Sequence, residues 1–255
     1  MAAVQLLPSH REGAEMKHLV YCILRAGGIA PEVCPVGVNK EAIRLLAAGG
    51  LAAAFSIVCE GRAVWNLEQA KAYADAVEAL HEVCPVLPVR YGCLLPSEES
   101  LVALLHERRD EFIASLGDVE GCVEMGIRIM LEAPVPLQAG ISQSPAAPQP
   151  SSGASYLADR RRHYAQPDGL SVERSVLSEE LPGAFRGLFV KHRSEYRPLL
   201  CNVTSSRPML SFYFLVKRAR QDAFRDAFRA MTLRAPRKML LSGPWPPYNF
   251  AGPGL

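Results

Sequence analysis

The residues of this chain that could do chemistry are few and scattered. Its six histidines show no metal-ligand spacing, and its seven cysteines include no C-x-x-C pair. No phosphate-binding glycine loop, zinc-protease helix or serine-nucleophile turn occurs. The charged run HERRDE at 106–111 has the composition of acid–base machinery, but we interpret it as a solvated helix face. The sequence therefore contains no recognised catalytic motif, and we expect no metal or cofactor; a small-molecule enzyme that uses Arg90 stays a minor alternative.

Arg90 is the most distinctive single candidate, because it ends a short apolar segment and precedes an aromatic residue and a glycine. The segment consists of Leu87, Pro88, Val89, Arg90, Tyr91 and Gly92. A guanidinium at this place could bind an anion or form a planar, bidentate pair with a carboxylate. We favour the ion pair, with Glu124 as the suggested partner. Three further arginines at 160–162 are interpreted as an exposed helix face rather than a phosphate site.

The chain ends in a proline-rich aromatic segment that follows an apolar strand directly. Its residues are Gly243, Pro244, Trp245, Pro246, Pro247 and Tyr248. The P-x-x-P pattern within it is the one that SH3-type grooves read, but such ligands usually lie in disordered segments. We favour a rigid tail that folds back over its own protein, with Trp245 and Tyr248 as partly buried anchors.

Charge is distributed unevenly along the 255 residues, although the net charge is only +2. Residues 1–132 contain 11 basic and 18 acidic side chains, a net of −7, whereas residues 133–255 contain 17 and 8, a net of +9. The basic half suggests a nucleic acid, an acidic partner or docking against the acidic half.

The longest apolar-rich run, 47–59, is too short to span a bilayer, and the first fifteen residues make a poor signal peptide. We therefore expect a cytoplasmic protein with reduced cysteines and no membrane partner. Residues 1–16 are interpreted as a flexible extension, and either Met1 or Met16 is the natural start.

Periodicity predicts an N-terminal α/β domain over 17–132, because strands alternate with helices there. The expected strands are 17–25, 51–58, 86–92 and 121–131, and the expected helices are 66–83 and one from Ser97 to Gly117. The next segment, 133–153, holds five prolines and almost no charge, which indicates an interdomain linker.

A second, smaller domain with the tail 243–255 is expected over 154–255. Its pattern is a short basic helix at 154–164, strands at 185–193, 198–206 and 208–218, a helix at 221–233 and a strand at 238–243. Helix boundaries between 163 and 184 are not fixed by the pattern. The fold class expected for the whole chain is therefore α+β in two domains, the second of the ferredoxin-like kind.

Several of these segments resemble the gas vesicle GvpL/GvpF family. LSGPWPPYNF is similar to the family's C-terminal signature, VLPVRYG resembles its V-L-P-V-R-F-G with Tyr91 in place of Phe, and GASYLADRR resembles the opening of its second domain. The likeness runs from about Lys17 to Phe250.

The resemblance implies a non-enzymatic accessory or minor structural protein in the assembly of gas vesicles, the gas-filled shells that give cells buoyancy. It implies as partners the small hydrophobic shell protein GvpA and other accessory proteins of the vesicle. A nucleic-acid-binding protein that uses the basic C-terminal half is the alternative from another class.

Overall fold

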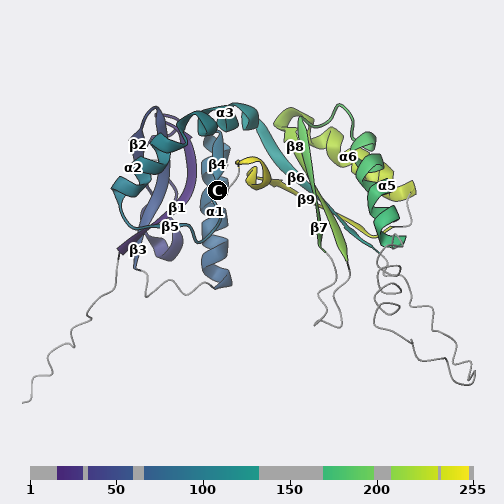
Figure 1. Cartoon of the computed structure of the whole chain (residues 1–255), viewed down its shortest axis with the longest axis horizontal. Helices are drawn as coiled ribbons and strands as arrows, with labels where there is room; N and C mark the ends of the chain where they lie inside the picture. The colour runs from purple at the N-terminus through teal and green to yellow at the C-terminus, as the bar shows by residue number, and fades with distance from the viewer. Residues whose placement is uncertain are drawn as a thin grey trace, which may run out of the picture. The chain divides into compact units, whose positions relative to one another are not determined.

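The computed structural model describes residues 16–30, 34–59, 66–131, 169–197, 208–234 and 237–252. The fold mixes helices with antiparallel sheets and divides into two compact units (Figure 1). The first unit comprises Met1–Glu124 together with Pro244–Leu255, and the second comprises Met125–Gly243.

The sheet of the first unit is built around β1 (Met16–Arg25), whose apolar run is buried on both faces. Its strand order is β2-β3-β1-β4, with β5 (Leu94–Leu95) also paired to β1. The other strands are β2 (Arg44–Ala48), β3 (Leu51–Cys59) and β4 (Val86–Pro88). The predicted strands 17–25 and 51–58 are thus confirmed, and β4 lies at the sheet edge as its proline requires.

Strand β2 is not predicted from the sequence, because its residues, RLLAA, do not alternate between apolar and polar and lead through Gly49 and Gly50 directly into the apolar run of β3. It forms a hairpin with β3 in which Ala48 pairs with Leu51. The two loop residues, Gly49 and Gly50, have φ of 60° and 84°, values that glycine adopts without the penalty of a Cβ atom.

The described part of this unit contains three α-helices: α1 (Leu67–Val83), α2 (Glu98–Glu107) and α3 (Arg109–Val119). The α1 N-cap is confirmed, since the Asn66 side chain accepts a hydrogen bond from the Gln69 amide at 2.8 Å. The single helix expected from Ser97 to Gly117 is two helices, because Arg108 leaves the helical conformation at φ −110° and ψ 20°. The apolar stripe continues through both, and this concealed the break from the sequence.

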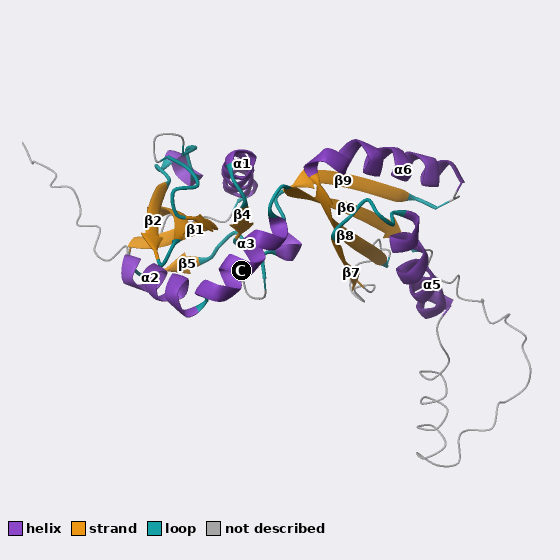
Figure 2. Cartoon of the chain, turned by 90° about the horizontal axis from the view of Figure 1, so that it is seen from above, coloured by secondary structure: helices purple, strands orange, loops and turns teal. Residues whose placement is uncertain are grey.

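The second unit contains a four-stranded sheet in the order β7-β8-β6-β9. Its strands are β6 (Cys122–Met130), β7 (Lys191–Arg197), β8 (Met209–Lys217) and β9 (Met239–Trp245), and its helices are α5 (Gly169–Ala184) and α6 (Gln221–Arg234). Both helices pack on one face of the sheet (Figure 2). On that face the rings of Phe185 and Phe224 stack at 4.5 Å, and both contact Phe214.

The structure changes several boundaries that the sequence suggested. The tail, expected in the second domain, belongs to the first unit from Pro244 onward, because its buried residues pack on the core of that unit. Strand β6 was expected in the first domain, but it pairs in the second sheet, so the first unit ends near Glu124 instead of at residue 132. Its alternating pattern identifies a strand and carries no information about its neighbours. The strand expected at 185–193 begins only at Lys191.

The segments 133–153, 154–164 and 198–206, expected as a linker, a helix and a strand, all lie outside the described residues. Because β6 and α5 both belong to the second unit, 133–153 connects two elements of that unit and is not the boundary between the units.

Candidate functional site

The segment from Leu87 to Gly92 forms the end of β4 and a tight turn. Leu87 and Val89 are fully buried, and the Val89 amide donates to the Tyr21 carbonyl at 2.9 Å. The turn closes with the Cys93 amide donating to the Arg90 carbonyl at 3.2 Å, while Gly92 has φ 101°. This segment is therefore anchored through its backbone, and its apolar side chains fill the core.

Tyr73 of α1 holds this segment against the sheet. Its hydroxyl lies 2.7 Å from the Val89 carbonyl, 2.8 Å from that of Val20 and 3.2 Å from that of Tyr21. Its ring stacks on Tyr21 at 4.9 Å and contacts Tyr91 at 5.0 Å. Burial, and then the nearby Tyr248, raise the pKa of Tyr73 well above its usual value, so this hydroxyl acts as a donor and not as a base.

The tail meets this cluster from the other end of the sequence. The 3-10 turn Tyr248–Phe250 packs against β4, and Tyr248 lies against the core of the first unit. Phe250 and Ala251 are buried, as are Pro246 and Pro247. Burial is also the main cause that raises the pKa of Tyr248. The two sequence motifs thus lie together in one unit.

Glu124 fixes the position of the tail through hydrogen bonds. Its carboxylate is 4% exposed and accepts two hydrogen bonds from Asn249, one from the backbone amide at 2.8 Å and one from the side-chain amide at 2.7 Å. Gly243 has φ 103°, but β9 continues through it to Trp245, so the exit from the last strand lies two residues later than the sequence suggested. Hydrogen bonds to a charged acceptor are the strong ones.

Trp245 and Arg90 contribute less to the packing of these segments than their neighbours do. Trp245 is 46% exposed, so it is partly buried, and after it the chain turns and presents the prolines, Tyr248 and Phe250 to the core. Arg90 is exposed, and no ion pair joins it to Glu124 within the described residues, since Asn249 occupies that carboxylate.

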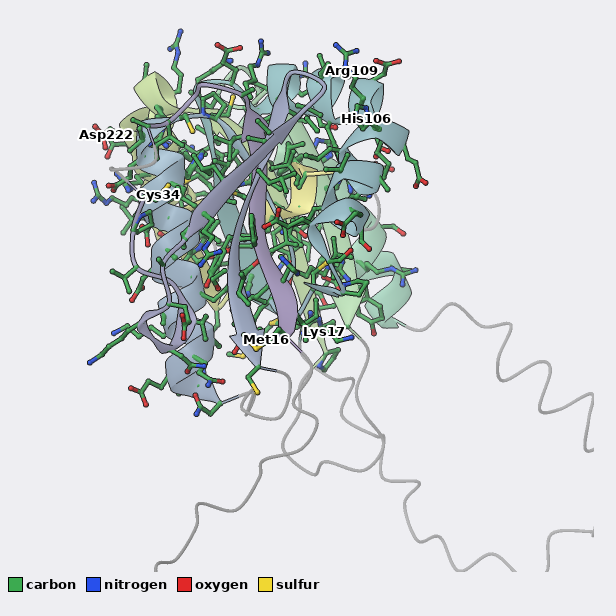
Figure 3. All side chains as sticks on the ribbon, turned by 90° about the vertical axis from the view of Figure 1, so that its left-hand side faces the viewer. Met16, Lys17, Cys34, His106, Arg109 and Asp222 are labelled. Atoms are coloured by element: carbon green, nitrogen blue, oxygen red, sulfur yellow. The ribbon has the colours of Figure 1, made fainter. Side chains whose placement is uncertain are left out.

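The charged run 106–111 is a surface network, in line with its interpretation as a solvated face. Arg108 forms a pair of hydrogen bonds with Glu111, at 2.7 and 2.9 Å, and lies 4.8 Å over the Phe112 ring. This arginine lowers the pKa of the Glu111 carboxyl. Arg109 donates to the Gly49 carbonyl at 2.7 Å, and Figure 3 shows it near His106 at the molecular surface.

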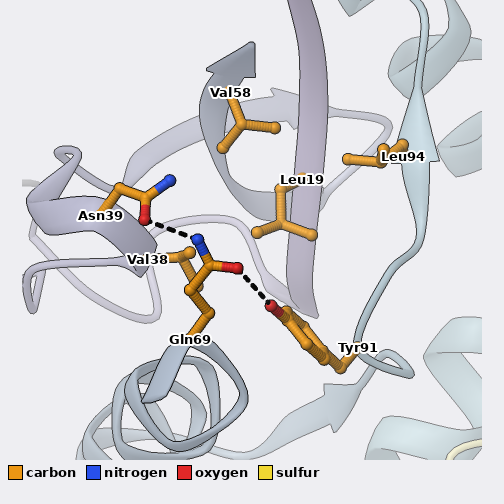
Figure 4. A pocket seen from close by; sticks show the side chains of 7 residues that line it. All are labelled: Leu19, Val38, Asn39, Val58, Gln69, Tyr91 and Leu94. Carbon is orange, nitrogen blue, oxygen red and sulfur yellow. Dashed lines mark hydrogen bonds between the residues drawn. The ribbon is translucent and has the colours of Figure 1, made fainter. Parts of the chain in front are cut away.

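A small apolar pocket adjoins the tyrosine cluster (Figure 4). The Gln69 amide crosses its rim, donating to Asn39 at 2.9 Å and lying 3.5 Å from the Tyr91 hydroxyl. The residues that the structure describes include no group of histidine, cysteine or acidic side chains arranged to hold a metal ion, and their six cysteines are free thiols. None of the described helices is long and apolar enough to cross a membrane.

Sequence reasoning missed Tyr73, Asn249 and the role of Glu124. Tyr73 sits on the apolar stripe of α1 and was read only as a core residue. The sequence signal for Glu124 is an acidic residue between the apolar Val123 and Met125 of a predicted strand.

Comparison with known proteins matches this architecture over nearly the whole chain. The family model described as "Gas vesicle synthesis protein GvpL/GvpF" matches residues 17–252. Gas vesicle protein L of Streptomyces sp. (strain CB03234) is 27% identical over 248 residues, which cover 91% of this chain and 92% of that protein. Gas vesicle protein F of the same strain is 25% identical over 252 residues, covering 92% and 99%.

Two solved structures share the fold. The gas vesicle protein GvpF from Anabaena sp. PCC7120 superposes with a TM-score of 0.68 at 13% identity, covering 93% of this chain and 96% of that one. GvpF from Microcystis aeruginosa gives 0.70 at 14% identity, covering 92% and 99%.

Proposed function

This chain belongs to the gas vesicle GvpL/GvpF family, and we propose that it is a non-enzymatic accessory or minor structural protein that acts in vesicle assembly by binding other vesicle proteins. The observation that carries the proposal is the family match over residues 17–252. It includes both the turn at 87–92 and the tail, which pack together in the first unit.

The chemistry of this region favours binding over catalysis. Its polar atoms are engaged in holding the fold, as the contacts of Tyr73 and Glu124 illustrate. The raised pKa values of Tyr73 and Tyr248 keep both hydroxyls protonated at neutral pH. A general base needs a pKa near the working pH, which these groups lack.

We infer that the second unit is a ferredoxin-like domain. Its elements follow the order β6-α5-β7-β8-α6-β9, the split β-α-β pattern of that fold. The sheet order β7-β8-β6-β9 places the first and third of its strands side by side in the centre, as this topology requires. We also propose that 133–153, which connects β6 to α5 within the second unit, is an exposed segment where limited proteolysis cuts first. First cuts within 66–131 would contradict this.

The proposed partners are the shell protein GvpA and other accessory proteins. We propose that this chain binds them in the cytoplasm and at the vesicle. A shell that excludes water must be apolar on its gas side, so its subunits need a partner before they assemble. Nothing in the comparisons supports the nucleic-acid alternative.

The test is affinity capture of this chain from vesicle-producing cells, with and without nuclease. We expect shell protein in the captured fraction, unchanged by nuclease. Capture of nucleic acid without shell protein would overturn the proposal.

A further inference from the structure

Three of the four edges of the two sheets carry features that keep a strand from pairing with another chain. The first sheet is bounded by β2 on one side and by β4 and β5 on the other, and the second sheet by β7 and β9. Strands β4 and β5 are three and two residues long, β9 contains Pro244, and the sequence of β7, KHRSEYR, holds four lysine, arginine and glutamate side chains. Short strands, prolines and charges all protect an edge.

Strand β2 has none of these features. Its sequence is RLLAA, so its one charged residue is Arg44 at the end, and every residue from Arg44 to Ala48 pairs with β3 in regular register. Figure 2 shows β2 at the outside of the first sheet, and no strand that the structure describes pairs with its outer edge. An unprotected apolar edge of this kind is a template for a further strand.

The backbone pattern identifies which groups of β2 point outward. Ala48 and Leu51 flank the two-residue hairpin loop and are paired, so their backbone groups bond each other. Leu46 lies two residues earlier and therefore also bonds β3. In an antiparallel pair the residues between them face the other way, so Leu45 and Ala47 turn their N–H and C=O groups to the outside.

The side chains of β2 leave apolar surface on both sides of the sheet. Leu45 packs against the core that includes the buried face of α1, so Ala47 belongs to the same side. Leu46 belongs to the other side, where α2 packs on β2. Leu45 and Leu46 are half-buried and Ala47 is exposed, so an added strand would bury more of all three.

From this geometry we propose that β2 pairs with β2 of a second copy of this chain, antiparallel about a two-fold axis at Leu46. In this register Leu45 lies opposite Ala47 of the partner subunit, and both have outward-facing backbone groups. The two such pairs form four backbone hydrogen bonds. The two Leu46 side chains meet at the axis. Arg44 lies opposite Ala48 of the partner subunit, so no like charges face each other.

A second copy fits this edge because the edge is complementary to itself in both hydrogen bonds and side chains. The two-fold axis is perpendicular to the sheet, so the two sheets become one continuous sheet with α2 of both copies on the same side. The same surface is used by both chains, so the assembly closes at two copies. Two edges of five residues form a smaller contact than the roughly 1,200–2,000 Å² of stable complexes, so the dimer is reversible.

Sedimentation velocity on the purified chain tests this inference without any other vesicle protein, so its outcome is independent of the proposed function. We expect a dimer that dissociates on dilution and no larger assemblies. Ala47→Pro deletes an outward N–H from each copy and no hydrogen bond to β3, so dimerisation should weaken at least about tenfold. Ala47→Val is the matched control, because it keeps the N–H and should dimerise as the unmodified chain does. Circular dichroism verifies that both variants are folded.

Disulfide cross-linking tests the register. In the proposed pairing the two copies of residue 46 lie opposite each other, with Cα atoms about 4.5 Å apart, which is within the range of a disulfide. The two copies of residue 48 lie four residues apart along the strands, about 14 Å. Oxidised glutathione accepts the two electrons and two protons of the thiols and leaves as two molecules of reduced glutathione. Leu46→Cys should then give a covalent dimer above the background of the unmodified chain, and Ala48→Cys should not.

Three results would overturn the inference. The first is an unmodified chain that stays monomeric at every concentration, including a chain whose β2 binds an extended segment of another vesicle protein instead. The second is Ala47→Pro that dimerises as strongly as Ala47→Val, which would place the contact elsewhere. The third is equal cross-linking of Leu46→Cys and Ala48→Cys, which would exclude the two-fold register.

Discussion

Removal of the Glu124 carboxylate is the sharpest test of how the tail is held. In Glu124→Ala, the backbone amide and side-chain amide of Asn249 lose acceptors that lie at 2.8 and 2.7 Å. Each hydrogen bond to a charged group contributes about 1.5–3 kcal/mol, which gives about 3–6 kcal/mol for the pair. Asn249 is only half-buried, so water replaces part of this, and we expect a loss of about 2–4 kcal/mol.

The assay is denaturant unfolding combined with hydrogen exchange at the Asn249 amide. Exchange reports the tail locally, which matters because a chain of two units need not unfold in one step. Glu120→Ala is the matched control, since this carboxylate is 64% exposed and lies 3.7 Å from Arg25. Surface pairs contribute about 0–1 kcal/mol.

A double-mutant cycle completes the test. Asn249→Ala removes only the side-chain donor, so the double variant Glu124→Ala/Asn249→Ala should lose less than the sum of the two single losses. Equal stabilities of Glu124→Ala and Glu120→Ala, with unchanged exchange at Asn249, would refute the role assigned to Glu124.

Phe250→Ala should lower the free energy of unfolding by about 3–5 kcal/mol, because the Phe250 side chain is only 7% exposed. Trp245→Ala should lower it by less than half as much, because Trp245 is 46% exposed. The reverse order would contradict the anchoring described above. Gly37→Ala should lower the free energy of unfolding by about 1–3 kcal/mol, because the added Cβ would collide with the Tyr21 hydroxyl. Adding Tyr21→Phe to this variant should recover part of the lost stability. Strictly additive losses in the double variant would argue against the collision. Burial raises the pKa of Tyr248 in the folded chain above its unfolded value near 10. The stability that protonated Tyr248 contributes is therefore complete below about pH 10 and is lost as the pH rises towards the folded pKa. In an alkaline series the unfolding free energy of Tyr248→Phe should fall less steeply than that of the unmodified chain, by about 1.4 kcal/mol per pH unit.

Local patterns in the sequence identified most of the elements but not their neighbours. The run of β1 and the apolar stripe of α1 are strong local signals, and both elements have nearly the predicted bounds. Strand β6 was recognised equally well as a strand, yet its partners β8 and β9 come from the second unit. Strand pairing is a long-range property that alternation along one strand does not encode.

The candidate site shows the same division. The turn at 87–92 and the tail were both singled out by composition, but their packing together depends on a contact between residues 124 and 249 that no local pattern indicates. Exposure of Trp245 could not be read from residue type, because a large aromatic residue predicts burial on average. The exposure of Trp245 is decided by the end of β9, because the chain turns toward the core only after this residue.

The central claim is that this chain is needed for vesicle assembly, and gene deletion in a vesicle-producing strain tests it most directly. Vesicles are counted by electron microscopy in the deletion strain and after complementation. We predict that vesicles are lost or malformed without the chain and are restored by the unmodified gene. A deletion strain with vesicles normal in number and shape would contradict the account.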